Sequence, residues 1–113
     1  RTTKLLEKNI IEAQGYKVRI ATNAIDALEI MERNHFDLII TDNEMPKMTG
    51  YEFVQEIRKY ANYKNTPILV LSSNDKSIWW PKFQQVGANE YIQKSEFNQE
   101  YFVRTINELL KCV

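Results

Sequence analysis

Three side chains with complementary chemistry each follow an apolar segment of this sequence. Asp42 comes just after the apolar run 36–40, Ser72 follows the run 68–71, and Lys94 ends a short segment that begins at residue 90. A carboxylate can act as a nucleophile, and an ammonium and a hydroxyl can stabilise charge on the oxygens of a transferred group. Together the three residue types favour phosphoryl transfer, in which the carboxylate forms an acyl phosphate.

Each of these residues also has a simpler interpretation, which is favoured when the residue is taken alone. An aspartate often begins a turn, a serine often caps a helix, and most lysines are solvated. The carboxyl ends of parallel strands lie at one edge of a sheet, and ligands of open α/β sheets bind there. If the three segments are neighbouring strands, we expect Asp42, Ser72 and Lys94 to converge on one shallow cleft. The carboxylate and the phosphoryl group are both anions, so their contact also needs a cation, for which Mg²⁺ is the usual choice.

The elements that would position these residues alternate between helix and strand. Strand patterns fall at 16–20, 36–40, 68–71 and 90–94, and helices are expected to end at Gly15, to begin after Asn23, to cover 53–60, to run from near Trp80 to Gly87, and to follow Asn98. This alternation predicts an α/β fold with a parallel sheet between two helix layers. The first helix has no strand before it, so one strand is expected to be missing from the N-terminus.

Two of these segments carry more specific expectations. Residues 16–20 alternate apolar and charged side chains, which is typical of a half-exposed strand at a sheet edge. Pro81 interrupts the fourth helical pattern. Since proline is tolerated in the first turn of a helix, the regular helix is expected to start near Trp80.

Length and composition exclude several classes of protein. The 113 residues correspond to one domain, spanning 1–113, and 43% hydrophobic residues are enough for a packed core. Fifteen basic and fifteen acidic residues give no net charge, which argues against direct partnership with nucleic acid or a membrane. One Cys and one His exclude a disulfide within the chain and a zinc site. Without a membrane-spanning run or a signal peptide, we expect a cytoplasmic location.

Several residues together resemble the receiver domain of two-component response regulators, and the resemblance covers essentially the whole chain. It rests on Asp42, on Met45-Pro46 and Gly50 after it, on Ser72, and on Tyr91 three residues before Lys94. The resemblance implies a flavodoxin-like, doubly wound parallel sheet with strand order 2-1-3-4-5. It also implies that Asp42 accepts a phosphoryl group from the phosphohistidine of a sensor histidine kinase or a histidine phosphotransfer protein.

The same resemblance assigns roles to the surrounding residues. Ser72 and Lys94 would each contact a phosphoryl oxygen, and Tyr91 would be the aromatic switch. Mg²⁺ would be held by Asp42 and by the backbone carbonyl of Glu44. The loop would be shaped by Met45, Pro46 and Gly50, and the acyl-phosphate lifetime would depend on the side chains of Glu44 and Asn74.

The chain departs from the family pattern in two places. The family has an acidic pair at the end of its first strand, whereas Arg1 falls at the start of the first helix. The domain is therefore expected to be incomplete at its N-terminus, with a gap between strands 2 and 3 of the sheet. Ser95 stands where many members have proline, and the Lys-Ser-Glu-Phe segment is similar to receivers fused to chemotaxis-type kinases.

Two adjacent tryptophans are candidates for a partner-binding surface. Neighbouring helical residues point about 100° apart, so Trp79 and Trp80 cannot both face the core. Trp79 aligns with Phe83 and is expected in the core. Trp80 is either partly buried by a neighbouring loop or an exposed anchor, with Tyr91, on the face of helix 4, strand 5 and helix 5. That face would bind a partner or form a homodimer.

The favoured function is a phosphorylatable signalling switch, not an enzyme with a diffusible substrate. A first alternative is a pseudo-receiver, which would bind proteins without being phosphorylated. A second is a small phosphatase with Asp42 as nucleophile. Such enzymes commonly place a general acid two residues further on, where this chain has Glu44.

Overall fold

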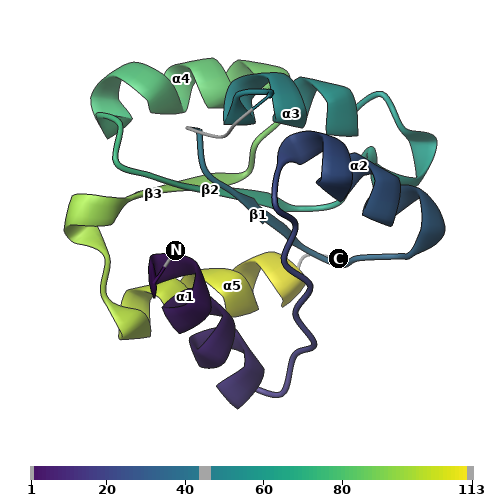
Figure 1. Ribbon diagram of the computed structural model, residues 1–113. Coiled ribbons are helices and arrows are strands. Elements are labelled where there is room, and N and C mark those ends of the chain that lie inside the picture. The colour runs from purple at the N-terminus through teal and green to yellow at the C-terminus, as the bar shows by residue number, and fades with distance from the viewer. Residues whose placement is uncertain (1, 44–46, 112–113) are drawn as a thin grey trace.

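A computed structural model describes residues 2–43 and 47–111, and in this part of the chain a parallel sheet lies between two layers of helices (Figure 1). The elements are α1 (Thr2–Ala13), α2 (Ala24–Arg33), β1 (Ile39–Thr41), α3 (Gly50–Ile57), η1 (Ala61–Tyr63), β2 (Ile68–Ser72), α4 (Lys76–Val86), β3 (Glu90–Gln93), η2 (Lys94–Glu96) and α5 (Gln99–Lys111). The described strands are ordered β1-β2-β3, and both pairings are parallel. The predicted α/β class with a doubly wound parallel sheet is confirmed. No described helix is long and apolar enough to cross a bilayer.

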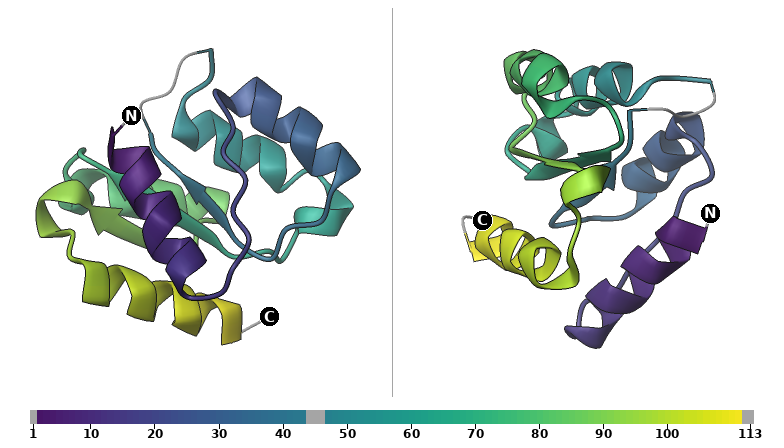
Figure 2. Two further views of the ribbon diagram at one scale, coloured as in Figure 1. Left: turned by 60° about the horizontal axis from the view of Figure 1, so that its bottom comes forward. Right: turned by 90° about the vertical axis from the view of Figure 1, so that its left-hand side faces the viewer.

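The central strand β2 separates two hydrophobic cores. α1 and α5 cover one face of the sheet, and α2, α3 and α4 cover the other (Figures 1 and 2). Leu69 and Leu71 pack in the core on the α1 and α5 side, whereas Ile68 and Val70 pack in the other core. Every residue of β2 is buried. Because both faces are covered, the strand needs a continuous apolar run, which is why it was predictable from the sequence.

The helix ends follow the predicted capping signals. Gly15 and Gly87 adopt the left-handed conformation, with φ of 93° and 107°, where glycine is the least strained residue. The side chains of Asn23 and Asn98 each accept the backbone N–H three residues further on, at 2.8 Å. These contacts satisfy donors that the first turn of a helix leaves unpaired.

The strand predicted at residues 16–20 is absent from the sheet, so that prediction is wrong. A strand needs a neighbour for its backbone N–H and C=O groups, and within residues 2–43 and 47–111 β1 pairs only with β2. A cleft of about 410 Å³ is lined by Val18 and Ile20 on one side and by Leu38 and Ile40 on the other. β1 covers Ile39–Thr41, so it begins later than the predicted strand 36–40.

Helix α4 begins earlier than predicted and contains Pro81 in its interior. Asp75 caps it, because its carboxylate accepts the backbone N–H of Ser77 at 2.9 Å and the Ser77 hydroxyl at 2.8 Å. Pro81 has no N–H to donate to the carbonyl of Ser77. Ser77 is exposed, so water can hydrogen-bond this carbonyl instead. The cap therefore adds helix upstream of the proline, where the sequence pattern predicted loop.

Both tryptophans of α4 are half-buried. The Trp79 ring lies 6.2 Å from that of Phe83, and the Trp80 ring lies 6.2 Å from that of Tyr91. Trp80 is thus partly buried, and the ring that it contacts belongs to Tyr91 of β3. The exposed apolar side chain of this helix is Ile78, which is 55% exposed.

The side chain of Arg58, at the end of α3, forms hydrogen bonds with the two loops that precede β2 and β3. Its Nε and Nη2 donate to the carbonyl of Gly87 at 3.1 and 2.6 Å, and its Nη1 donates to the carbonyls of Tyr63 and Thr66 at 2.7 Å each. Nη2 also donates to the side chain of Asn89 at 3.0 Å. The planar guanidinium group can serve all these acceptors at once, which a lysine cannot do.

Replacing Arg58 with Lys is therefore expected to lower the free energy of unfolding by about 2 kcal/mol, because part-buried carbonyls lose their donors. Urea denaturation of the intact protein measures the change. Arg104→Lys, on the exposed side of α5, is the matched control and should leave stability unchanged. Equal stability of the two variants would contradict a structural role for Arg58.

Candidate functional site

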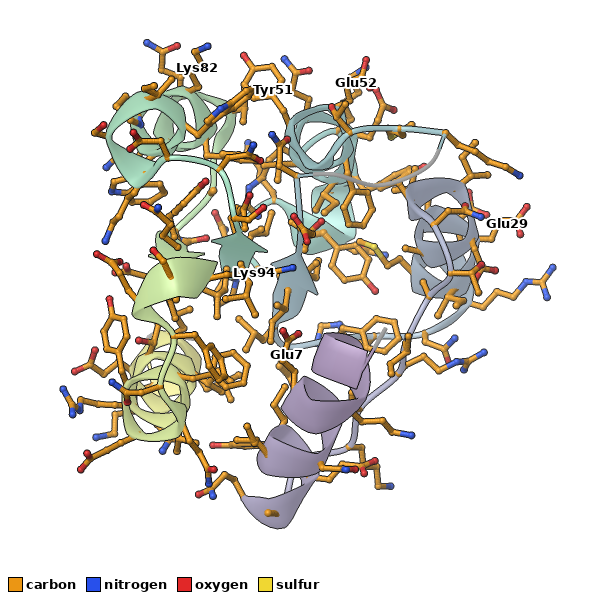
Figure 3. The ribbon with its side chains drawn as sticks, turned by 60° about the vertical axis from the view of Figure 1, so that its left-hand side comes forward. Glu7, Glu29, Tyr51, Glu52, Lys82 and Lys94 are labelled. Atoms are coloured by element: carbon orange, nitrogen blue, oxygen red, sulfur yellow. The ribbon has the colours of Figure 1, made fainter. Side chains whose placement is uncertain are left out.

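The three residues predicted to share a site lie at the carboxyl ends of the three described strands. Asp42 directly follows β1, Ser72 ends β2, and Lys94 directly follows β3. Lys94 extends across the strand ends (Figure 3), and its Nζ donates to Oδ2 of Asp42 at 2.8 Å. The Asp42 and Lys94 side chains remain 24% and 36% exposed. A carboxylate and an ammonium are thus held together at an edge that a second molecule can reach.

Ser72 is fully buried, and its hydroxyl is engaged with Asn74. The hydroxyl donates to Oδ1 of Asn74 at 2.8 Å, and the backbone N–H of Asn74 donates back to the hydroxyl oxygen at 3.0 Å. A hydroxyl has one proton to donate, so in this conformation the proton is directed at Asn74. The sequence placed Ser72 and Asn74 near the site, and the structure joins them to each other.

Tyr91 lies inside the molecule and contacts the same loop. The centroid of its ring lies 5.8 Å from that of Phe83 and 6.2 Å from that of Trp80. Its hydroxyl donates to the backbone carbonyl of Asn74 at 2.8 Å. Burial raises the pKa of the Tyr91 phenol, so the group is neutral and can donate this hydrogen bond at neutral pH. The Tyr91 side chain therefore points inward in this structure.

Asn43 is a buried residue of the site that the sequence analysis missed. Its Nδ2 donates to Oδ1 of Asn74 at 3.2 Å, its Oδ1 accepts the backbone N–H of Tyr51 at 3.3 Å, and its carbonyl accepts the N–H of Gly50 at 2.9 Å. The side chain thus links the start of α3 to the loop after β2. The signal available in the sequence was its position next to Asp42.

Gly50 brings α3 into direct contact with the backbone of the candidate nucleophile. A Cβ atom at this position would lie 2.0 Å from the carbonyl oxygen of Asp42 and 2.7 Å from Cα of Asn43. Thr49 caps the helix with a capping box. The Thr49 side chain accepts the backbone N–H of Glu52, and the Glu52 side chain accepts the backbone N–H of Thr49. The sequence predicted Gly50 as a loop residue, and the structure places it in the first turn of the helix.

The predicted loop and metal residues Glu44, Met45 and Pro46 lie outside the described residues. Among the described residues, no cluster of three or more Asp, Glu, His or Cys side chains could hold a metal ion. Mg²⁺ is usually bound by one or two carboxylates, with phosphate and water oxygens completing the shell. Asp42 provides one such carboxylate in a cleft that Glu7 also lines (Figure 3), so the chemistry of the donors fits Mg²⁺ bound together with a phosphate group.

Comparison with known protein families and sequences identifies relatives of this chain. Residues 2–107 match the response regulator receiver domain. The sensor histidine kinase CheAY of Helicobacter pylori is 30% identical over 97% of this chain, and the probable transcriptional regulator ycf29 of Porphyra purpurea is 31% identical over 96% of it. The chain spans only 14% of the first relative and 51% of the second.

Solved structures with the same fold agree with this match. The chemotaxis protein CheY4 of Vibrio cholerae has a TM-score of 0.88 and 32% identity, covering 96% of this chain and 89% of that one. The receiver domain of a sensor histidine kinase from Pseudomonas aeruginosa, solved with a magnesium ion in its active-site cleft, has a TM-score of 0.87 and 25% identity, covering 97% and 89%. The chain therefore belongs to the response regulator receiver domain family of two-component signalling.

Proposed function

We propose that this domain accepts a phosphoryl group on Asp42 from the phosphohistidine of a sensor histidine kinase or a histidine phosphotransfer protein. The observation that carries the proposal is the contact between Asp42 and Lys94 at the open edge of the sheet. In the reaction, a carboxylate oxygen of Asp42 attacks phosphorus, and the phosphorus–nitrogen bond of the donor breaks. The imidazole nitrogen keeps the electron pair of that bond and takes up a proton.

The neighbouring side chains have roles that follow from their chemistry. When Asp42 becomes an acyl phosphate, the carboxylate loses its charge and the phosphoryl oxygens carry the negative charge. The ammonium of Lys94 then pairs with one of these oxygens. Ser72 donates its hydroxyl proton to another phosphoryl oxygen, which requires the hydroxyl to turn away from Asn74. Tyr91, whose hydroxyl bonds the backbone carbonyl of Asn74 in this loop, is the aromatic switch, and its inward orientation is the one that accompanies phosphorylation. These movements are small changes within one domain, as in other local switches with distant effects.

The Asp42 carboxylate and the backbone carbonyl of Glu44 are the groups that would hold Mg²⁺. When bound, the ion offsets the negative charge that a carboxylate and a phosphoryl group bring together. Support comes from the carboxylate in the open cleft and from the Pseudomonas receiver domain, whose structure was solved with magnesium in its cleft. Met45 and Pro46 would shape the loop after Asp42, Gly50 lets α3 approach the Asp42 backbone, and Glu44 and Asn74 would set how long the acyl phosphate lasts.

The output is a change in protein binding at the face of α4, β3 and α5. Trp80 and Tyr91 contact each other on these elements, so the position of the Tyr91 ring affects how Trp80 is packed. This face would bind a partner or form a homodimer, and the domain would act in the cytoplasm without binding nucleic acid directly. Its catalysis is limited to its own phosphorylation and dephosphorylation.

Intact-mass measurement tests the phosphoacceptor function. The intact protein is incubated with acetyl phosphate and Mg²⁺, and in parallel with acetyl phosphate and a chelator. We expect one added phosphoryl group with Mg²⁺ and much less with the chelator. A folded protein that gains no phosphoryl group would instead support the pseudo-receiver, and turnover of a diffusible phosphoester would support the phosphatase.

A further inference from the structure

We infer that Asn43 is a positioning residue that acts through Asn74 to control how readily Ser72 turns toward a phosphoryl group. The inference rests on the proposed function, because it concerns the acyl phosphate on Asp42. Its contacts connect the loop after β1, which carries the nucleophile, with the loop after β2, which carries the hydroxyl.

The side-chain oxygen of Asn74 is the shared element of this arrangement. It accepts two hydrogen bonds, one from the Ser72 hydroxyl at 2.8 Å and one from Nδ2 of Asn43 at 3.2 Å. The Ser72 proton must leave this oxygen before it can be donated to a phosphoryl oxygen. With Asn43 in place, the oxygen keeps a donor after the hydroxyl has left, so the cost of leaving a part-buried acceptor unpaired is avoided.

Asn43 is itself held in the orientation that this role needs. Its Oδ1 accepts the N–H of Tyr51, and its backbone carbonyl accepts the N–H of Gly50, so the amide is fixed against the first turn of α3. The side chain is buried, which favours one rotamer. On the other side, the hydroxyl of Tyr91 holds the backbone carbonyl of Asn74. The Ser72 hydroxyl is then the part of the network that turns.

Truncating Asn43 would strengthen the hold of Asn74 on the Ser72 hydroxyl. In Asn43→Ala, the Ser72 hydroxyl is the remaining donor of the two that reach Oδ1 of Asn74. Turning the hydroxyl toward a phosphoryl group then leaves that oxygen without either of these two donors. A net hydrogen bond of typical strength corresponds to a change of about fivefold in the rate of phosphorylation.

A double-mutant cycle separates this role from a general loss of structure. The initial rate of phosphorylation by acetyl phosphate and Mg²⁺ is measured by intact mass for the wild-type protein, Asn43→Ala, Asn74→Ala and the double variant. We expect Asn43→Ala to lower the rate about fivefold in the wild-type background. In the Asn74→Ala background the same substitution should change the rate by less than about twofold, because the residue it acts through is gone.

Asn89→Ala is the matched control. The Asn89 side chain accepts the backbone N–H of Ile68 at 2.8 Å, at the opposite end of β2, so its loss should lower stability without changing the rate. An equal effect of Asn43→Ala in both backgrounds, or no effect in either, would overturn the inference while the proposed function stands. Absence of an adduct on the folded wild-type protein would overturn both.

Discussion

Replacing Asp42 with Asn is expected to reduce phosphorylation by acetyl phosphate at least about 10³-fold, to below detection by intact mass. An uncharged amide is a poor nucleophile and cannot form the acyl phosphate. The substitution keeps the shape of the side chain almost unchanged. Loss of the adduct would therefore identify Asp42 as the acceptor, because the geometry of the cleft is retained.

The same substitution is expected to leave the fold intact. The ion pair between Asp42 and Lys94 is partly exposed, with side chains that are 24% and 36% exposed. Ion pairs of this kind contribute about 1 kcal/mol or less to stability. Urea denaturation should show a change of at most that size, so loss of the adduct cannot be ascribed to unfolding.

Asp75→Asn is the matched control for Asp42→Asn. Asp75 lies at the same edge of the sheet, in the loop after β2, but its carboxylate caps α4 by accepting the N–H and the hydroxyl of Ser77. Asparagine caps a helix about as well as aspartate, so this variant should remain stable and should still be phosphorylated. An adduct that persists in Asp42→Asn, or one that is lost in Asp75→Asn, would show that another residue accepts the phosphoryl group.

The parts of the fold that the sequence predicted are those that depend on local pattern and burial. The run 68–71 is apolar at every position because β2 is covered on both faces. Asn23, Asn98 and Gly87 mark helix ends through contacts within a few residues of themselves. Asp42 and Lys94 were found for a related reason, since residues that follow parallel strands reach the same edge.

The predictions that were wrong depend on distant partners or on competing local signals. The alternation of residues 16–20 favours extended backbone, but pairing requires a neighbouring strand, and Ile20 remains 43% exposed. α4 starts earlier than its sequence pattern predicts, because the cap at Asp75 begins a helix upstream of Pro81. Asn43 was missed because its role depends on Tyr51 and Asn74, which lie 8 and 31 residues away in the sequence.

Gly50→Ala is expected to lower the free energy of unfolding by about 3 kcal/mol, although alanine normally favours a helix over glycine. The added Cβ would lie 2.0 Å from the carbonyl oxygen of Asp42 and 2.7 Å from Cα of Asn43. Both are backbone atoms, so no change of rotamer relieves the clash. The first turn of α3 must move away from the loop after β1. Urea denaturation measures the loss of stability.

Gly15→Ala provides the comparison that separates close packing from backbone strain. Gly15 has φ of +93°, but a Cβ there would meet no atom within 4 Å. Its substitution should cost about 1–2 kcal/mol, from the left-handed conformation alone. If Gly50→Ala were no more destabilising than Gly15→Ala, the close approach of α3 to the Asp42 backbone would be refuted.

The clash at Gly50 also has a consequence for the site. Moving α3 would displace the N–H groups of residues 50 and 51, which are hydrogen-bonded to Asn43. Asn43 adjoins Asp42, so the carboxylate would shift relative to Lys94, and displacements of about 1 Å can cost about 10²-fold in rate. We therefore expect Gly50→Ala to be phosphorylated far more slowly than Gly15→Ala even where both are folded. Equal rates would mean that the position of the acceptor does not depend on the packing of α3.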